Sequence, residues 1–565
     1  MELLGLRSLA TVCGHPFHLA VMAVGQPGTQ ARFIDTQIRI GDADLIEAQR
    51  ASPVANLIDQ LFIADLSRER GVPIIGVMGH ATGLYRAEQI RELDRLAIEE
   101  QGIPGYVLMC RAGAVVFERI RTRWPESRAV TVLCGGGNNA GDGYVVARLA
   151  LEAGFRVQLI AALDPEALKG DALRAARDWR SLGESAAPED AEFSGELIVD
   201  ALLGTGLDRP AEGRFAALIE RANASGLPIL AIDVPSGLSA DTGQALGACI
   251  RASLTISFIG RKRGMYTAAA GDWVGELAFD DLGVPDAVYQ SLDPDATLLD
   301  KAVIADCLPP RSNHTHKGQL GRVLVIGGDH GMSGAPILAG QAALRSGSGL
   351  VTLASRGGTA AAAVALQPEL MARDVSDPEL LQALLEATDV LALGPGLGRS
   401  SWSLALWQRA VVSDRVLVLD ADGLYWLSEE PVQRGNWVLT PHPGEAARLL
   451  GLSVGEVQGD RFAAARALAD QYQAVVVLKG WGSLIATPAG KVQACPYGNP
   501  AMATAGMGDA LTGIIASLIG QGIDMDTAAA VGVVVHALAG DVAARGRRQI
   551  LASDLIDHLD KVLPA

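Results

Sequence analysis

The chain has 565 residues, too many for one hydrophobic core, so its length predicts two or more domains. Hydrophobic residues make up 49% and charged residues 20%, as in a globular protein, and the net charge of −17 argues against non-specific binding of nucleic acid. The six cysteines form no CxxC pair, which favours free thiols over disulfides or a zinc site. Because no uninterrupted apolar run reaches transmembrane length, we expect a cytoplasmic protein without membrane contacts.

Residues 1–80 contain no pattern to which chemistry can be assigned, and we treat them as an N-terminal extension of unknown role. The apolar stretch near the start lacks a clearly basic n-region and an A-x-A site, so it is a weak signal peptide. Patchy helical periodicity follows over residues 31–76. One hypothesis is that Met78 is the true start of the working protein, and a tryptic peptide from residues 1–77 would contradict it.

A glycine-rich loop between a predicted strand and a predicted helix dominates the first half. Helical periodicity over 83–122 is followed by an apolar run at 129–133, the sequence GGGNNAGDG at 135–143 and a helical pattern over 144–153. Consecutive glycines let the backbone approach a ligand, and a helix start adds free N–H groups that suit phosphate. Oxygen-bearing side chains in the loop also suit a hard cation. The alternative is a βα turn without a ligand.

Strands and helices continue to alternate up to residue 259. We predict strands over 156–163, 196–203, 228–234 and 254–259, and helices over 164–182 and 214–224. This order predicts a parallel sheet covered by helices on both faces, with ligands at the carboxyl ends of the strands. Asp200 and Asp233 stand at two such ends, each followed by a glycine motif. Either aspartate alone could equally cap a strand or form a salt bridge.

The motifs GGGNNAGDG, VDALLGTG and DVPSG together resemble the YjeF N-terminal family, the NAD(P)H-hydrate epimerases. The resemblance implies a Rossmann-like three-layer domain over residues 81–300. It implies a potassium ion bound by oxygen atoms of Asn139, Asp200 and Ser236. The residues implied to line the hydrate site are Asn138, Asn139, Ala140, Gly141, Asp142, Gly204, Thr205, Gly206, Leu207, Asp208, Arg209, Pro210 and Asp233.

Epimerisation at C6 of a hydrated nicotinamide ring breaks and remakes a bond beside an amine nitrogen. An acid/base group near that carbon is sufficient, because the ring nitrogen can expel the hydroxyl group or open the ring. We choose Asp233 as the catalytic acid/base residue, since a strand-end carboxylate facing a cleft suits proton transfer.

The second half restarts the α/β pattern after a proline-containing linker at 290–320. A strand leads into a glycine turn over 321–328, and further strands are predicted over 350–354, 390–393, 415–420, 437–440 and 474–478. The last of these continues as a hairpin into 484–487, and helices are predicted over 337–346 and 510–519. These elements predict a second α/β domain over residues 305–565.

The loop before the last of these helices combines an anion site with a carboxylate. Gly506 and Gly508 free the backbone to surround an anion at the helix start, and Asp509 adds its carboxylate there. Such a carboxylate is repulsive unless it takes a proton from a nucleophile or pairs with a cation. Phosphoryl transfer to a hydroxyl group needs this pairing of features.

The motifs GPGLG, TPHPGE, LKG and AGMGD resemble the ribokinase-like superfamily, and more closely its ADP-dependent NAD(P)H-hydrate dehydratases. The resemblance implies that ADP or ATP, with Mg²⁺, phosphorylates the C6 hydroxyl after Asp509 has taken its proton. Loss of phosphate then restores the dihydronicotinamide. Residues implied to bind the hydrate are Ala335, Gly396, His442 and Asp509. Residues implied to bind the nucleotide are Lys479, Gly480, Trp481, Gly482, Ser483 and Gly508.

The two resemblances imply one bifunctional enzyme that acts on hydrated NADH and NADPH, and such domains often form homo-oligomers. One alternative makes the second domain a small-molecule kinase of the hydroxymethylpyrimidine or pyridoxal type, beside a non-catalytic ligand-binding module. Another alternative makes the first domain a binding or scaffold module, because fold does not fix function.

Overall fold

The computed structural model describes residues 8–9, 18–21, 34–37, 82–182 and 190–564. The chain divides into two units, Met1–Gly76 and Val77–Ala565. In the first unit, β1 (Ser8–Leu9), β2 (His18–Val21) and β3 (Ile34–Gln37) form an antiparallel sheet. Strand β3 lies at the start of the stretch 31–76, in which the sequence shows patchy helical periodicity. The rest of that stretch, with Met78, lies outside the described residues.

Six parallel strands form one sheet of the second unit, in the order β11-β9-β8-β7-β5-β6. The strands are β5 (Ala129–Cys134), β6 (Arg156–Ala161), β7 (Leu197–Ala201), β8 (Ile229–Ile232), β9 (Leu254–Phe258) and β11 (Glu276–Asp280). Those in the centre are buried along their whole length, which is typical of a parallel sheet covered on both faces. The sequence predicted all of them except β11.

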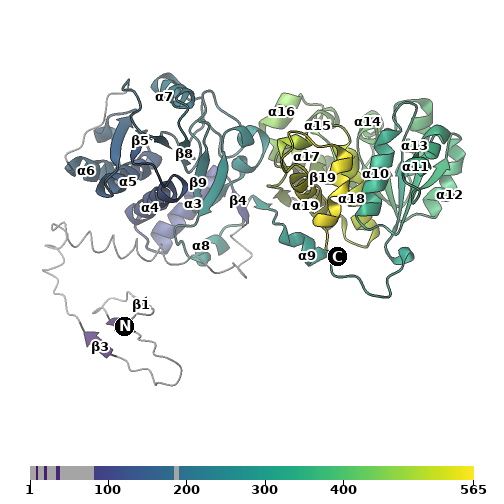
Figure 1. The fold of residues 1–565 in the computed structure, drawn as a ribbon, viewed down its shortest axis with the longest axis horizontal. Helices are drawn as coiled ribbons and strands as arrows, with labels where there is room; N and C mark the ends of the chain where they lie inside the picture. Colours follow the sequence, from purple (N-terminus) through teal and green to yellow (C-terminus); the bar gives the residue numbers. More distant parts are fainter. Residues whose placement is uncertain (1–7, 10–17, 22–33, 38–81, 183–189, 565) are drawn as a thin grey trace. The chain divides into compact units, whose positions relative to one another are not determined.

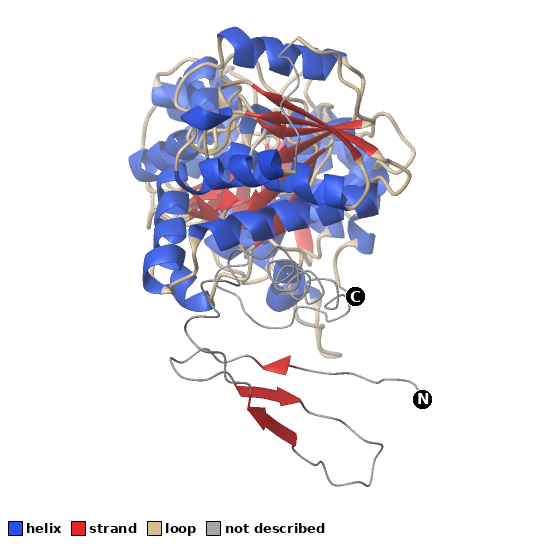
Figure 2. Cartoon of the chain, turned by 90° about the vertical axis from the view of Figure 1, so that its left-hand side faces the viewer, coloured by secondary structure: helices blue, strands red, loops and turns tan. Residues whose placement is uncertain are grey.

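Helices cover both faces of this sheet and give the three layers that we predicted (Figure 2). One face packs against α3 (Ala87–Arg95), α4 (Gly105–Arg123), α5 (Asn138–Glu152), α6 (Gly170–Ser181) and α8 (Asp286–Gln290). The other face packs against α7 (Gly213–Ala224). Short helical turns fill the connections, namely η1 (Leu96–Glu100), η2 (Pro165–Ala167), η3 (Arg263–Tyr266) and η4 (Ala268–Asp272).

The second sheet has twelve strands in the order β10-β4-β12-β21-β20-β19-β18-β17-β16-β13-β14-β15. Its parallel part comprises β13 (Arg322–Ile326), β14 (Leu350–Ser355), β15 (Met371–Asp374), β16 (Val390–Leu393), β17 (Val416–Leu419), β18 (Trp437–Leu439) and β19 (Val475–Leu478). The predicted hairpin is confirmed, because β20 (Leu484–Ala486) pairs antiparallel with β19, and β21 (Val492–Ala494) pairs with β20.

Two apolar cores cover the faces of the second sheet. Figure 1 labels most of the helices that contribute to them. Helices on one face are α12 (Leu381–Glu386), α13 (Ser401–Val411), α14 (Asp422–Glu429), α15 (Pro443–Leu450), α16 (Val454–Gly459) and α17 (Arg461–Tyr472). Helices on the other are α9 (Ala302–Cys307), α10 (Gly334–Arg345), α11 (Gly357–Leu366), α18 (Met507–Gly520), α19 (Met525–Ala543) and α20 (Ala552–Asp557). Remaining turns are η5 (Lys317–Gln319), η6 (Pro378–Leu380), η7 (Pro500–Met502) and η8 (Leu559–Lys561).

Three short strands from residues 83–298, which otherwise belong to the first α/β domain, extend the second sheet. They are β4 (Gly83–Tyr85), β10 (Arg261–Lys262) and β12 (Ala296–Leu298), and β12 pairs with β21. The predicted helix over 83–122 is therefore wrong at its start, where Leu84 is a fully buried strand residue. Its apolar neighbours fit a helix period equally well, and only pairing with β10 and β12 decides the conformation.

Helix α19 is long and apolar enough to cross a membrane, but most of its length is buried in the second core. A core helix of a large domain has the same composition, so this feature gives no reason to place the chain in a bilayer. The described cysteines (Cys110, Cys134, Cys249, Cys307 and Cys495) are all free thiols.

Candidate functional site

The glycine loop between β5 and α5 forms the floor of the first site. Asn138 opens α5 directly after the three glycines. A Cβ atom on Gly135 would lie 1.8 Å from the carbonyl oxygen of Leu202, so only glycine allows the loops after β5 and β7 to approach this closely. The sequence thus brings the start of α5 against the loop that follows Asp200.

Oxygen atoms of the three residues predicted to bind potassium gather beneath this floor. The buried Asp200 carboxylate accepts hydrogen bonds from the Ser236 backbone N–H (2.8 Å) and from its Oγ (2.6 Å). The Asn139 Nδ2 group donates to the carbonyl oxygen of Leu203 (3.0 Å), whereas its Oδ1 atom is buried without a partner among the described residues. An unpaired buried oxygen is costly unless a ligand satisfies it. Burial raises the pKa of Asp200 to about 6 despite these hydrogen bonds.

Asp233 follows β8 in a left-handed backbone conformation with φ of 67°, which is rare outside glycine. Its Oδ2 atom accepts a hydrogen bond from the Thr205 hydroxyl (2.5 Å), and its Oδ1 atom forms an ion pair with Lys262. The Lys262 ammonium also donates to Ser257 Oγ (3.2 Å) and the Phe258 carbonyl (2.8 Å). The Lys262 side chain is only 1% exposed, so the pair holds Asp233 in one orientation.

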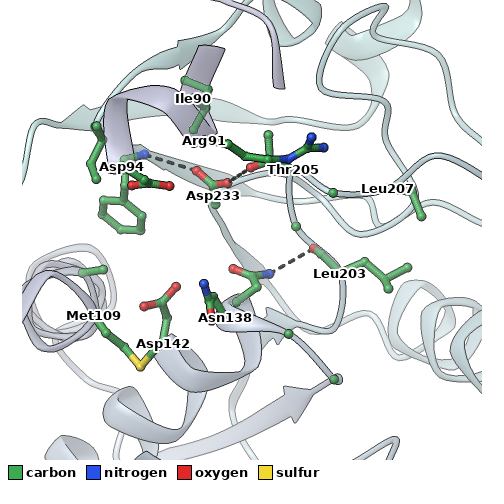
Figure 3. A pocket seen from close by; sticks show the side chains of 18 of the residues that line it. Ile90, Arg91, Asp94, Met109, Asn138, Asp142, Leu203, Thr205, Leu207 and Asp233 are labelled. Carbon is green, nitrogen blue, oxygen red and sulfur yellow. Dashed lines mark hydrogen bonds between the residues drawn. The ribbon is translucent and has the colours of Figure 1, made fainter. Parts of the chain in front are cut away.

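A cavity of about 690 Å³ opens between these groups (Figure 3). Asp94 of α3 and Asp142 of α5 line it together with Asp233 and Lys262. Burial raises the pKa of Asp94 to about 6, with Lys262 opposing the shift. Burial also raises the pKa of Asp142 well above its usual value, and the charges of Asp233 and Asp94 add to this effect. The site therefore combines an ion-paired carboxyl group, Asp233, with two buried carboxyl groups, Asp94 and Asp142, whose pKa values are raised.

Most residues predicted for the hydrate site lie on this cavity. Those that line it are Asn138, Asn139, Asp142, Gly204, Thr205, Gly206, Leu207, Asp208, Arg209 and Asp233. Ala140 and Gly141 are buried in the first turn of α5, and Pro210 is an exposed residue beyond the lining. Asp200 and Ser236 are buried side by side and do not line the cavity.

A second cluster of charges lies at the strand ends of the second sheet. Lys479, directly after β19, donates through Nζ to Asp420 Oδ1 (2.5 Å) and lies 3.7 Å from Glu445 Oε2. Burial lowers the pKa of Lys479, but the two carboxylates outweigh it and leave the pKa raised. Asp420 is 1% exposed and also accepts a hydrogen bond from Thr512 Oγ1 of α18 (2.9 Å). Asp420 thus ties Lys479 to the helix that carries Asp509.

The AGMGD loop places Asp509 in the first turn of α18. Gly506 precedes the helix with φ of 92°. A Cβ atom on Gly508 would lie 3.1 Å from Lys479 Nζ and 3.2 Å from Asp420 Oδ2, so these groups pack closely around the helix start. Burial raises the pKa of Asp509 to about 7, and the charges of Asp420 and Glu445 add to it while Lys479 opposes it.

His442 caps the start of α15. Its Nδ1 atom accepts hydrogen bonds from the backbone N–H groups of Gly444 (2.9 Å) and Glu445 (3.3 Å), so its proton resides on Nε2. The Nε2 atom lies 3.5 Å from Glu445 Oε1, and 57% of the side chain is exposed. The cap fixes the ring orientation and leaves one edge accessible to a ligand.

The remaining predicted residues form two groups. Ala335, in the first turn of α10, adjoins Gly396, where an added Cβ would lie 3.3 Å from the Ala335 Cβ. The loop after β19 is closed by Ser483, whose Oγ donates to the Gly480 carbonyl (2.9 Å). Trp481 is 40% exposed, while Gly482 is buried.

Sequence reasoning missed three residues with a clear place in these sites, namely Asp94, Lys262 and Asp420. Asp94 precedes the recognised motifs, and Lys262 stands in the basic run RKR, which is typical of a solvated surface. Asp420 was noted only as the end of a strand, although its position ahead of Asp422 and Gly423 was a usable signal. Within the described ranges, no group of three or more His, Cys, Asp or Glu side chains has the arrangement of a metal site.

The first α/β domain has a parallel sheet between two layers of helices, and the second has a mostly parallel sheet. Charged groups at the strand ends of both sheets define a two-site α/β enzyme. Two family models match the chain, one described as "YjeF-related protein N-terminus" at residues 105–264 and one as "NAD(P)H-hydrate dehydratase" at residues 323–561. The chain belongs to the family of bifunctional NAD(P)H-hydrate repair enzymes.

The relatives that show this family are similar over nearly their full length. The bifunctional NAD(P)H-hydrate repair enzyme Nnr of Coxiella burnetii is 47% identical over 482 residues, which cover 85% of this chain and 99% of the relative. Nnr of Escherichia coli K12 is 42% identical over 484 residues, which cover 85% of this chain and 94% of the relative. A solved structure of an ADP/ATP-dependent NAD(P)H-hydrate dehydratase of Bacillus subtilis, crystallised with ATP and Mg²⁺, is 30% identical in sequence. The match has a TM-score of 0.43 and covers 47% of this chain and 96% of that protein.

Proposed function

We propose that this chain repairs hydrated NADH and NADPH by two reactions at two separate sites. Residues 81–300 epimerise the R and S hydrates, and residues 305–565 dehydrate the S form at the expense of ADP or ATP. The observation that carries this proposal is the pairing, in one chain, of the Asp233–Lys262 cavity with the Lys479–Asp420–Asp509 cluster. A dehydratase alone would leave the R epimer unrepaired, so the two reactions belong together.

The first site suits a potassium ion, because the Asn139 Oδ1 atom has no hydrogen-bond donor among the described residues and Asp200 and Ser236 supply further oxygen atoms. We propose that these three residues hold the ion. A bound monovalent cation would supply positive charge beside the loops that line the cavity. Asp233 is proposed to exchange protons at the C6 hydroxyl, and Lys262 and Thr205 fix its two oxygens for that role.

The second site is proposed to carry out phosphoryl transfer followed by elimination. Asp509 takes the proton of the C6 hydroxyl, and the N–H groups at the start of α18 surround the transferred phosphoryl group. Lys479 and residues 480–483 with Gly508 are proposed to bind the nucleotide, and Ala335, Gly396 and His442 the hydrate. The local excess of carboxylates over Lys479 suits Mg²⁺, which would neutralise phosphate charge, and we propose that Glu445 would hold this ion through water.

Several wider expectations accompany this function. We propose that the enzyme works in the cytoplasm, where its free thiols stay reduced. We propose that it forms homo-oligomers and that it binds neither nucleic acid nor membrane. Residues 1–80 have no assigned part in either reaction.

The proposal is tested with two single variants, each of which serves as the control for the other. Purified R and S hydrates are incubated with Asp233→Ala and Asp509→Asn proteins, and the species are separated by chromatography. Asp233→Ala should stop catalysed interconversion of epimers while S-hydrate dehydration continues. Asp509→Asn should have the opposite effect, with a loss of about 100-fold or more in dehydration. Unchanged epimerisation in Asp233→Ala would remove the catalytic claim for the first site.

A further inference from the structure

The carboxyl groups of the first cavity have contrasting surroundings. Asp233 accepts a hydrogen bond from the Thr205 hydroxyl group and forms an ion pair with the Lys262 ammonium group. Asp142 begins the second turn of α5 and lies beside the buried side chain of Met109 (Figure 3). No hydrogen bond to the Asp142 carboxyl group is formed by any described residue. Burial without a hydrogen-bonding partner, beside two other carboxyl groups, favours the protonated form of a carboxyl group, in which it can donate a proton.

We infer that Asp142 is the proton donor of the epimerase site and acts with Asp233 across the cavity. This inference rests on the proposed function of that site. Figure 3 shows Asp142 on one side of the cavity and Asp233 on the other, with open space between them. The two hydrate epimers differ in the ring face that carries the hydroxyl group. Two groups on opposite sides of a bound ring can therefore transfer protons at its two faces, one group at each face.

The reaction balances with these two groups and water. The Asp142 O–H gives its proton to the departing C6 hydroxyl, the C6–O bond breaks, and water leaves. The ring nitrogen supplies its electron pair to form an N1–C6 double bond. A water molecule then adds to C6 from the opposite face, and the Asp233 carboxylate takes its proton. To convert the other epimer, Asp233 donates the proton and Asp142 accepts it. Proton exchange with solvent returns both groups to their starting protonation states.

Asp94 is the rival donor, because it also lines the cavity and has no hydrogen-bonding partner among the described side chains. It lies on the same side as Asp233 in Figure 3, and Lys262 stabilises its charge. The charged groups that act on Asp142 are Asp233 after β8, Asp94 of α3 and Lys262 of β10. Asp142 itself raises the pKa of the buried Cys134 thiol of β5. The two carboxylates favour a protonated Asp142, and Lys262 alone opposes it.

The test compares Asp142→Asn with Asp94→Asn in the full chain. The rate of conversion of purified R hydrate to S hydrate is measured without nucleotide, with spontaneous epimerisation subtracted. Asp142→Asn should lower kcat by about 100-fold or more, the usual contribution of a general acid. Asp94→Asn should lower kcat by a clearly smaller factor, about 10-fold at most, because Asp94 lines the cavity without giving the proton. Dehydration of S hydrate by the same preparations should stay unchanged, which shows that each variant is folded.

A pH profile separates proton donation from a structural role. Wild-type kcat should fall at high pH as Asp142 loses its proton, and the residual rate of Asp142→Asn should lack this fall. In ¹⁸O-labelled water, each wild-type epimerisation should introduce label at C6. Retained activity in Asp142→Asn, a selective loss in Asp94→Asn, or epimerisation without label would overturn the inference. An inactive wild-type protein would instead remove the proposed epimerase function itself.

Discussion

At the residue scale, the raised pKa of Asp509 sets the expected pH response of the dehydratase. A base must be ionised, and burial raises the pKa of this carboxyl group to about 7. The kcat for dehydration of S hydrate should therefore fall as pH drops below about 7. Replacing Asp420 by Asn removes a negative charge and frees Lys479 to interact with Asp509. The pKa of Asp509 then falls, so the acidic limb of the kcat profile should move to lower pH, and an unmoved limb would contradict this account.

The orphaned oxygen of Asn139 gives a second prediction at this scale. Replacing Asn139 by Ala removes Oδ1 while the ion pair of Asp233 stays in place. Activation of epimerisation by K⁺ should then require about 10-fold more cation, the low end of losses for altered metal sites. The measurement is a K⁺ titration at constant ionic strength, and dehydration of S hydrate is the control. An unchanged half-saturation point would rule out Asn139 as a potassium ligand.

At the scale of elements, the approach of the β5–α5 loop to the β7 loop depends on Gly135. A Cβ there would meet the Leu202 carbonyl oxygen at 1.8 Å, and because the backbone fixes the positions of both atoms, no side-chain rotation relieves this clash. Gly135→Ala should destabilise the protein by about 1–3 kcal/mol, as over-packed substitutions do, and should also impair epimerisation. Gly137→Ala is the matched control, since its Cβ would meet nothing within 4 Å and its φ is −122°. Equal melting temperatures for the two variants would contradict the argument.

The same scale shows what sequence reasoning could and could not reach. Apolar runs bounded by glycine predicted the central strands, because a buried parallel strand has its own local signature. The predicted helix over 83–122 is wrong at residues 83–85, because β4 (Gly83–Tyr85) is short and its conformation depends on pairing with β10 and β12, which lie far away in the sequence. Motif resemblance found residues that line the first cavity. The sequence did not predict Lys262 as a site residue, because only the folded chain shows that its side chain is buried against Asp233.

At the scale of the whole molecule, contacts join residues of the first half to the loop proposed to bind nucleotide. The buried Thr267 hydroxyl donates to the Gly482 carbonyl (3.1 Å) and accepts from Arg461 Nε (2.9 Å). Arg461 also donates to the Lys479 carbonyl (3.2 Å). The first half therefore supports the backbone of this loop, so the affinity for nucleotide should depend on residues outside the dehydratase half.

Thr267→Val tests this dependence, because it removes both hydrogen bonds and leaves part of a buried guanidinium unpaired. We expect a loss of about 1–3 kcal/mol in stability and a several-fold rise in KM for the nucleotide. Thermal unfolding and dehydratase kinetics measure the two effects. Thr122→Val is the control, since Thr122 is exposed and bonds only within its own helix. A normal KM in Thr267→Val would show that the loop holds its shape without this contact.

Absorbance at the dihydronicotinamide band is the most direct test of the central claim that one chain runs both reactions. Purified protein is mixed with an equilibrated R/S mixture of hydrated NADPH, Mg²⁺, K⁺ and ADP, and then with the same mixture lacking nucleotide. We predict rapid and full recovery of the band with nucleotide and none without it. Recovery that stops at the S fraction and then follows spontaneous epimerisation would contradict the epimerase claim. Absence of recovery with both ADP and ATP would contradict the account as a whole.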